Sequence, residues 1–328
     1  MKLAAVYPWQ QATWQLLAQS RARHAMPHAL IVSGIQGVGK AHFVHALSAW
    51  LLCQQPQPQG ACGACKSCQL WQADSHPDYR LLQAQTDDKG KTSRVIKVDQ
   101  VRDVVAFLNK SAQLNGYRVA VIEPADILNT NAANSLLKTL EEPGANSAII
   151  LLTDQPLALL PTIRSRCQHF ALPLPAIEQA QVWLAPQLAK PEQAGLLLRL
   201  SENAPLAALA LQNAAWFGLR HDLAKQLLAV AQHKQSALQA SQYWQKQLSS
   251  EELLLALALL LADTLLVALG QDNAIKNTDL LPIISTLAND LSVARLLALH
   301  QQCLESQRLV AANIQAGLLL DNVWQALV

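Results

Sequence analysis

Four of the six cysteines in this 328-residue sequence fall within one short segment. They are Cys53, Cys62, Cys65 and Cys68, a C-x8-C-x2-C-x2-C pattern that directly follows a helix-like stretch. Thiols at this spacing suit tetrahedral Zn²⁺, whereas disulfides are disfavoured in a reducing compartment. Because four thiolates leave no open coordination position, the pattern predicts a structural zinc site and not a catalytic one. Two alternatives stay open, unpaired surface thiols and an iron–sulfur cluster.

A glycine-rich loop is the second place where residue types and spacing indicate chemistry. Residues 34–41 read GIQGVGKA, which places Gly34, Gly37, Gly39 and Lys40 between a predicted strand and a predicted helix. In this order, backbone N–H groups and the helix N-terminus converge on phosphate oxygens. The layout therefore predicts a P-loop that binds phosphate.

Two parts needed for ATP hydrolysis are missing around this loop. Ala41 has no hydroxyl with which to hold Mg²⁺. A second predicted strand ends in Glu123-Pro124 where an acidic pair is expected, and Pro124 has no group that acts as a base. Lys40 therefore admits two interpretations, residual nucleotide binding or a loop kept only as scaffold, and we favour the scaffold.

The elements that must position these residues alternate between strand-like and helix-like segments. The predicted strands are Leu30–Ser33, Tyr79–Leu82, Arg118–Ile122, Ala148–Thr153 and Gln168–Leu172. The predicted helices between them cover residues 40–52, 99–110 and 127–142. This alternation predicts a parallel sheet covered by helices on both faces.

Proline usage divides the rest of the chain. Fourteen of the fifteen prolines lie at or before Pro205, and only Pro282 lies beyond it. Because proline interrupts helices, the segment after about residue 213 is predicted to be a separate all-helical domain. Ser249 and Glu252 form a plausible capping box ahead of the apolar run Leu253–Leu269.

Composition restricts the classes of function. The formal net charge of +2 is too small for a general electrostatic surface toward nucleic acid or membrane. The apolar stretch near Met1 is too short for a secretory signal, so we expect a cytoplasmic protein. Leu253–Leu269 carries Asp263 and is shorter than the roughly 20 residues of a membrane span, so we expect a buried helix there.

Several segments in roughly the first 210 residues resemble the delta-prime family of bacterial clamp-loader subunits. They are Tyr7-Pro8-Trp9, His28-Ala29-Leu30, the four-cysteine insertion after the P-loop helix, and the segment 134–143 with the sequence NSLLKTLEEP. Alone, the last segment reads only as an amphipathic helix ended by a proline. Together and in this order, the segments are highly specific. The resemblance implies an AAA+ fold with a lid and an oligomerisation collar, in a component of the DNA polymerase III holoenzyme.

The same resemblance gives a role to the segment Ser165-Arg166-Cys167. In the family, an arginine here is presented across a subunit interface to ATP bound by the neighbour, where its charge stabilises the transferring γ-phosphate. The resemblance therefore implies that Arg166 is an arginine finger acting in trans. Arg164 is an alternative for that role, and an ordinary surface ion pair is the alternative interpretation of Arg166.

The departures from active family members agree with one another. Ala41, Glu123 and Pro124 alter the two nucleotide motifs, and Leu206 stands where active subunits are expected to carry a nucleotide-sensing arginine. The pattern therefore resembles delta-prime more than the ATP-hydrolysing tau or gamma subunits.

We expect an α/β protein with three domains. Residues 1–172 form an AAA+ P-loop-like domain with a zinc module, 173–212 a small helical lid, and 213–328 an all-α collar. The expected function is that of a non-hydrolysing subunit in a hetero-pentamer with tau/gamma and delta subunits, which loads the sliding clamp onto primed DNA. Its expected cofactor is structural Zn²⁺, and no membrane partner is expected.

Two rival functions stay open. An active P-loop ATPase predicts Mg-dependent turnover by the isolated chain that disappears in Lys40→Ala. A zinc-dependent DNA-binding protein predicts salt-sensitive DNA binding that is lost when the cysteines are replaced.

Overall fold

Five parallel strands form one sheet in the part of the chain that this computed structural model describes, residues 3, 5–84, 95–114, 116–312 and 314–328. The strands are β1 (Ala29–Ser33), β2 (Tyr79–Leu82), β3 (Arg118–Ile122), β4 (Ser147–Thr153) and β5 (Gln168–Ala171), in the spatial order β2-β3-β4-β1-β5. The central strands β3, β4 and β1 are buried along their whole length. Such strands need cover on both faces, so the predicted type of sheet is confirmed.

The register brings the carboxyl ends of the central strands to one edge of the sheet. Ser33 of β1 pairs with Thr153 of β4, and Ile122 of β3 pairs with Leu151 of β4. The loops that leave these strands therefore start side by side. In open α/β sheets, this edge is where ligands bind.

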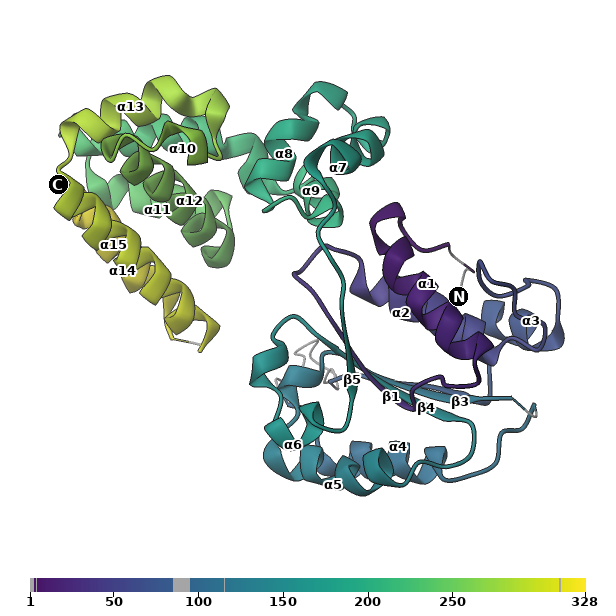
Figure 1. Ribbon diagram of the computed structural model, residues 1–328. Coiled ribbons are helices and arrows are strands. Elements are labelled where there is room, and N and C mark those ends of the chain that lie inside the picture. Colours follow the sequence, from purple (N-terminus) through teal and green to yellow (C-terminus); the bar gives the residue numbers. More distant parts are fainter. Residues whose placement is uncertain (1–2, 4, 85–94, 115, 313) are drawn as a thin grey trace. The chain divides into compact units, whose positions relative to one another are not determined.

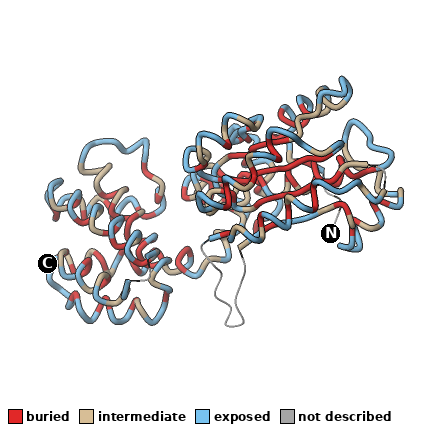
Figure 2. The backbone as a smooth tube through the Cα atoms, turned by 90° about the horizontal axis from the view of Figure 1, so that it is seen from below, coloured by how far each residue is buried: buried red, intermediate tan, exposed pale blue. Residues whose placement is uncertain are grey.

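Helices cover both faces of the sheet (Figure 1). One face carries α1 (Gln11–Ala22), α2 (Lys40–Leu52) and α3 (Lys66–Gln72), and the other carries α4 (Val98–Leu108), α5 (Thr130–Glu141) and α6 (Pro161–Arg164). Three short 3-10 turns, η1 (Pro8–Gln10), η2 (Ala125–Ile127) and η3 (Pro156–Ala158), complete this part of the described chain. Figure 2 shows the buried strands between outer segments that are more exposed.

The chain divides into two compact units, Met1–Ala176 and Ile177–Val328. In the second unit, α7 (Ile177–Leu184), α8 (Ala194–Leu200) and α9 (Pro205–Leu211) share one hydrophobic cluster, with η4 (Ala185–Gln187) and η5 (Pro191–Gln193) between them. Six further helices pack around a larger hydrophobic cluster: α10 (Ala215–Ala231), α11 (Ala237–Gln247), α12 (Ser250–Ala268), α13 (Leu281–Asp290), α14 (Val293–Ala311) and α15 (Ala316–Gln325). Two 3-10 turns, η6 (Asp272–Ala274) and η7 (Thr278–Leu280), lie between α12 and α13.

These elements, a parallel sheet covered by helices on both faces and followed by helices alone, confirm the predicted α/β class. The division into three domains at residues 172 and 212 stays a prediction.

The helix α12 is built as its sequence predicts. Ser249 accepts a hydrogen bond from the backbone N–H of Glu252, and the Glu252 carboxylate accepts one from the N–H of Ser249, which completes the capping box. Most of the apolar run that follows is buried. Among the described residues no single helix has the length and apolar character of a membrane span, although the pair Thr278–Asp290 and Val293–Val310, bent by 115°, meets both criteria together.

Candidate functional site

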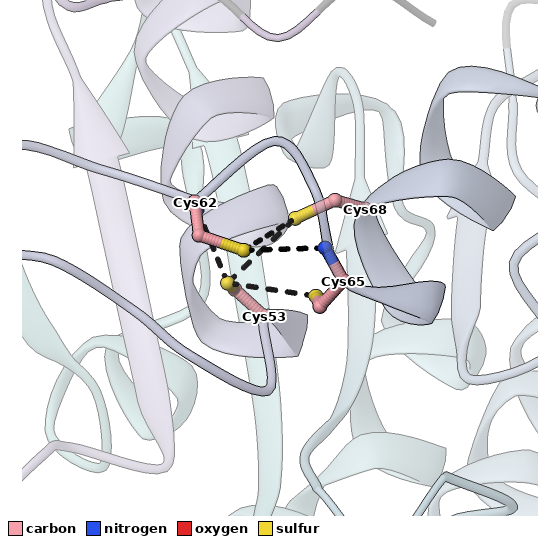
Figure 3. Close-up of side chains that lie close together, drawn as sticks. All are labelled: Cys53, Cys62, Cys65 and Cys68. Carbon is pink, nitrogen blue, oxygen red and sulfur yellow. Dashed lines mark hydrogen bonds between the residues drawn. The ribbon is translucent and has the colours of Figure 1, made fainter.

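The four predicted metal-ligating cysteines lie together between two helices (Figure 3). Cys53 follows the last residue of α2, Cys65 directly precedes α3, Cys68 lies within α3, and Cys62 is on the connecting loop. All four Sγ atoms lie within 4.8 Å of one another, and the closest pairs are 3.6 to 3.9 Å apart. Tetrahedral coordination at a Zn–S distance of about 2.3 Å requires sulfur atoms about 3.8 Å apart. The spacing therefore fits a metal ion held by four sulfurs.

The electrostatics of the cluster favour a bound cation. The backbone N–H groups of Ala64 and Cys65 lower the pKa of Cys62 to about 6, so this sulfur carries charge at neutral pH. Burial raises the pKa of Cys68, because a thiolate there loses contact with water. A metal ion would provide the positive charge that such buried sulfurs need as thiolates. All four cysteines are free of disulfides.

Two tryptophans hold the loop that leads from α2 to the cluster. The indole N–H of Trp50 donates to the carbonyl of Gln57 at 2.7 Å, and that of Trp14 donates to the carbonyl of Pro58 at 2.9 Å. Gln57 also exchanges backbone hydrogen bonds with Gly60. The cysteine module is thus attached to α1 and α2 by contacts that the cysteine spacing did not predict.

Of the four P-loop residues predicted from the sequence, the three glycines lie between β1 and α2, and Lys40 is the first residue of α2. Gly37 and Gly39 have φ angles of 85° and 91°, in the left-handed region that residues with a side chain rarely adopt. A Cβ atom on Gly34 would lie 2.9 Å from the Val38 side chain. The backbone conformation of the loop therefore requires glycine at these three positions.

Lys40 is only 8% exposed and is already engaged within the chain. Its ammonium group donates to the carbonyl of Ile35 at 2.9 Å and forms an ion pair with Asp154, the first residue after β4. Ala41, next in α2, presents only a methyl group. The lysine that would meet a phosphate is thus neutralised by a carboxylate.

Glu123 lies at the same edge of the sheet, directly after β3. Burial raises the pKa of its carboxyl group, and the positive charge of Lys40 acts in the opposite direction. Its Oε2 accepts a hydrogen bond of 3.4 Å from the Gln83 amide. Pro124, the next residue, supplies no proton acceptor on its side chain. Sequence reasoning missed Asp154, although its position directly after a buried strand was a usable signal.

The N-terminal turn η1 covers the P-loop. The Trp9 indole N–H donates to the carbonyl of Val38 at 2.9 Å, and the Gln10 amide donates to the carbonyls of Val38 and Gly39 at 3.0 Å each. Gln10 is completely buried, and a Cβ atom on Gly39 would lie 2.8 Å from the Tyr7 ring. The sequence pointed to Tyr7-Pro8-Trp9 only as part of a resemblance and did not reveal these contacts.

Arg166 lies just after α6 and contacts the end of α5. Its Nε donates to Glu141 Oε1 at 2.6 Å, its Nη2 lies 2.5 Å from the same oxygen, and its Nη1 donates to the carbonyl of Thr162 at 2.9 Å. The Arg166 side chain is 33% exposed. None of these contacts involves the P-loop, so the two predicted nucleotide-related features are separate within this chain.

The remaining predicted residues are partly buried. The Nε of Arg164 is buried and has no hydrogen-bond partner among the described residues. Burial raises the pKa of Cys167 to about 12, as expected of a packed thiol. Leu206 lies half-buried in α9, in the second unit.

Comparisons with known proteins place this chain beside replication proteins. Residues 9–176 match the family described as DNA polymerase III, delta subunit, and residues 214–324 match DNA polymerase III, delta subunit, C terminal. DNA polymerase III subunit delta' of Escherichia coli is 37% identical over 97% of this chain and 93% of its own length. The protein of the same name in Yersinia pestis is 35% identical over 90% of this chain and 87% of its own length.

Two further comparisons give a shorter match or a lower identity. The Pseudomonas aeruginosa subunit delta' is 47% identical, but the match spans 63% of this chain and 61% of that protein. A crystal structure of a gamma subunit-related protein from Thermotoga maritima superposes on 95% of this chain and 98% of its own, with 19% identity and a TM-score of 0.49.

Proposed function

Because this chain belongs to the DNA polymerase III delta-prime family of clamp-loader subunits, we propose that it hydrolyses no ATP itself and supplies Arg166 to ATP bound by a neighbouring subunit. The observation that carries the proposal is a contrast between two cations. Lys40 is buried and paired inside its own P-loop, whereas the Arg166 guanidinium is held at the surface.

The P-loop argues against hydrolysis for three physical reasons. Ala41 cannot hold Mg²⁺, and Pro124 cannot activate water. The Lys40 charge is compensated by Asp154, so a phosphate would have to displace a carboxylate that is already bound. Hydrogen bonds from Trp9 and Gln10 to the carbonyls of Val38 and Gly39 hold the loop in its conformation. These features support a scaffold role for Gly34, Gly37, Gly39 and Lys40.

Arg166 has the properties required for a role in trans. A guanidinium remains charged at every physiological pH and offers five N–H groups in a planar fork. In this chain polar contacts to Glu141, Thr162 and Ser165 fix the fork while a third of the side chain stays exposed. A cation fixed in this way can stabilise negative charge on a neighbour's γ-phosphate without the cost of reorganisation.

The cysteine module has a structural role in this proposal. Cys53, Cys62, Cys65 and Cys68 would hold Zn²⁺ with all four positions filled, which leaves no site for water or substrate. The free thiols also suit a reducing cytoplasm. The metal would fix the start of α3 against the end of α2, and no step of ATP hydrolysis passes through it.

The partners follow from the family. We propose a hetero-pentamer with tau/gamma and delta subunits, in which residues 213–328 form this chain's part of the collar and residues 173–212 its lid. The sliding clamp and primed DNA would be bound by the assembled complex. The chain alone would catalyse nothing, although it is part of the polymerase holoenzyme.

Arg166→Ala in the reconstituted loader tests the central claim. Removing the guanidinium should slow ATP turnover at the neighbouring site by about 10³-fold, because arginine fingers contribute on this order. The measurement is phosphate release by a loader in which that neighbour alone keeps an intact P-loop. Assembly, followed by size-exclusion chromatography, should be unchanged. Normal turnover in a loader that contains Arg166→Ala would refute the assignment.

A further inference from the structure

The contact between Arg166 and Glu141 joins two segments that are separate in the sequence. Glu141 is the last residue of α5, and Arg166 follows α6. Both Nε and Nη2 of the guanidinium approach the single oxygen Oε1, at 2.6 and 2.5 Å. This side-on arrangement engages one edge of the guanidinium. Because the group is planar, the second N–H of Nη2 points away from Glu141.

A rigid helix holds the Glu141 carboxylate in place. The Asn129 side chain caps the first turn of α5 by accepting the Ala132 N–H at 2.8 Å. Leu136 and Leu140 on the same helix are buried in the core beneath the sheet. The position of the carboxylate is therefore set by packing and does not depend on a mobile loop.

Neither the helix nor the folded unit gains much from a carboxylate at this position. A negative charge in the last turn is unfavourable for the helix dipole. The Glu141 side chain is 50% exposed and the Arg166 side chain 33%, and ion pairs this exposed contribute little to stability. What the pair does provide is a defined direction for the guanidinium, with the Thr162 carbonyl fixing Nη1.

We propose that Glu141 is the positioning residue of the arginine finger. This inference rests on the proposed function of Arg166 in trans. Glu141 touches neither ATP nor the metal that accompanies it; it orients the fork before the neighbouring subunit binds. Orientation set in advance lowers the barrier of the chemical step and leaves substrate binding almost unchanged.

Glu141→Gln tests the proposal because it keeps the size of the side chain and removes its charge. In a loader whose only intact P-loop is that of the neighbour facing Arg166, kcat for ATP should fall by about 10-fold while KM changes by less than about 2-fold. A merely structural effect would instead appear as lost assembly or a lower Tm of the subunit, both of which are measured on the same preparations.

The matched control is Glu142→Gln, which removes the same charge one residue later. Glu142 is exposed and has no ion pair among the described residues, so its replacement should leave kcat within about 2-fold of the wild type. The double variant Glu141→Gln/Arg166→Ala completes a thermodynamic cycle. It should be no slower than Arg166→Ala alone, since Glu141 acts through Arg166.

The outcomes separate the two proposals. If Arg166→Ala is slow and Glu141→Gln retains wild-type kcat, Glu141 has no positioning role and the arginine finger stands. If Glu141→Gln slows an Arg166→Ala loader further, Glu141 acts independently and the proposal is wrong. If Arg166→Ala itself turns over normally, both assignments fall. A decrease in kcat confined to backgrounds that keep Arg166 supports both.

Discussion

At the scale of single residues, protonation separates Cys62 of the cluster from Cys167, a partly buried cysteine that packs against the core. The pKa of Cys62 is lowered to about 6 by the N–H groups of Ala64 and Cys65, so it is a thiolate at neutral pH. Burial raises the pKa of Cys167 to about 12, so that sulfur stays protonated. Since metal ions bind thiolates, the environment of Cys62 favours a metal ion, and the buried Cys68 requires the charge of that ion to become a thiolate.

Replacing Cys68 by serine should abolish metal binding. A hydroxyl is a much weaker zinc ligand than a thiolate, and three remaining sulfurs leave an open position, so the zinc content should fall from about one per chain to near zero. Metal analysis of the purified chain measures this directly. Cys167→Ser is the matched control and should retain its zinc. A Cys68→Ser chain with full zinc content would contradict the assignment of the four ligands.

At the scale of elements, one buried carboxylate connects α12 to the segment before α13. Asp263 is 1% exposed within the mostly apolar helix α12. It accepts hydrogen bonds from the backbone N–H of Lys276 at 3.0 Å and from the backbone and side-chain N–H groups of Asn277 at 2.7 Å each. Asp263, which interrupts the apolar run in the sequence, thus provides the hydrogen-bond acceptor for N–H groups of the segment before α13.

Asp263→Ala should destabilise the chain by about 3 kcal/mol, because it leaves buried donors without acceptors. Urea unfolding of the chain, followed by the helical circular dichroism signal, measures the change in the free energy of unfolding. Asp272→Ala removes an exposed carboxylate of the same connection and should change stability by less than about 0.5 kcal/mol. Equal effects of the two substitutions would show that the Asp263 hydrogen bonds contribute nothing specific.

At the scale of the whole molecule, the two units have separate hydrophobic cores. The first holds the sheet, the P-loop, the cysteine module and Arg166, and the second contains helices only among its described residues. The proposed site of chemistry is absent from both units, since Arg166 would act on ATP that another subunit binds. In this proposal, function depends on assembly, because one chain would supply only part of the catalytic constellation.

Restoring the missing hydroxyl should not make this chain an ATPase. Ala41→Thr adds a Mg²⁺ ligand, yet Lys40 remains paired with Asp154 and Pro124 still offers no base. We expect turnover by the purified variant to equal that of a Lys40→Ala background control in a phosphate-release assay. Mg-dependent turnover by the isolated wild-type chain, lost in Lys40→Ala, would instead establish the rival active ATPase.

Part of the fold and of the candidate site could be predicted from the sequence because the signals are local. The four cysteines lie within sixteen consecutive residues, so their spacing alone predicted that they meet. The capping box of α12, the glycine loop and the alternation of strand and helix are also patterns of neighbours along the chain. Each is governed by backbone geometry and periodicity, which sequence spacing records.

What only the tertiary structure decided is which distant residues meet. The strand order β2-β3-β4-β1-β5 places Asp154 against Lys40, and the packing of α5 and α6 places Glu141 against Arg166. The attachment of Trp9 and Gln10 to the P-loop likewise spans about thirty residues. No local pattern encodes these partners, because the choice among many carboxylates for one cation depends on how whole elements pack.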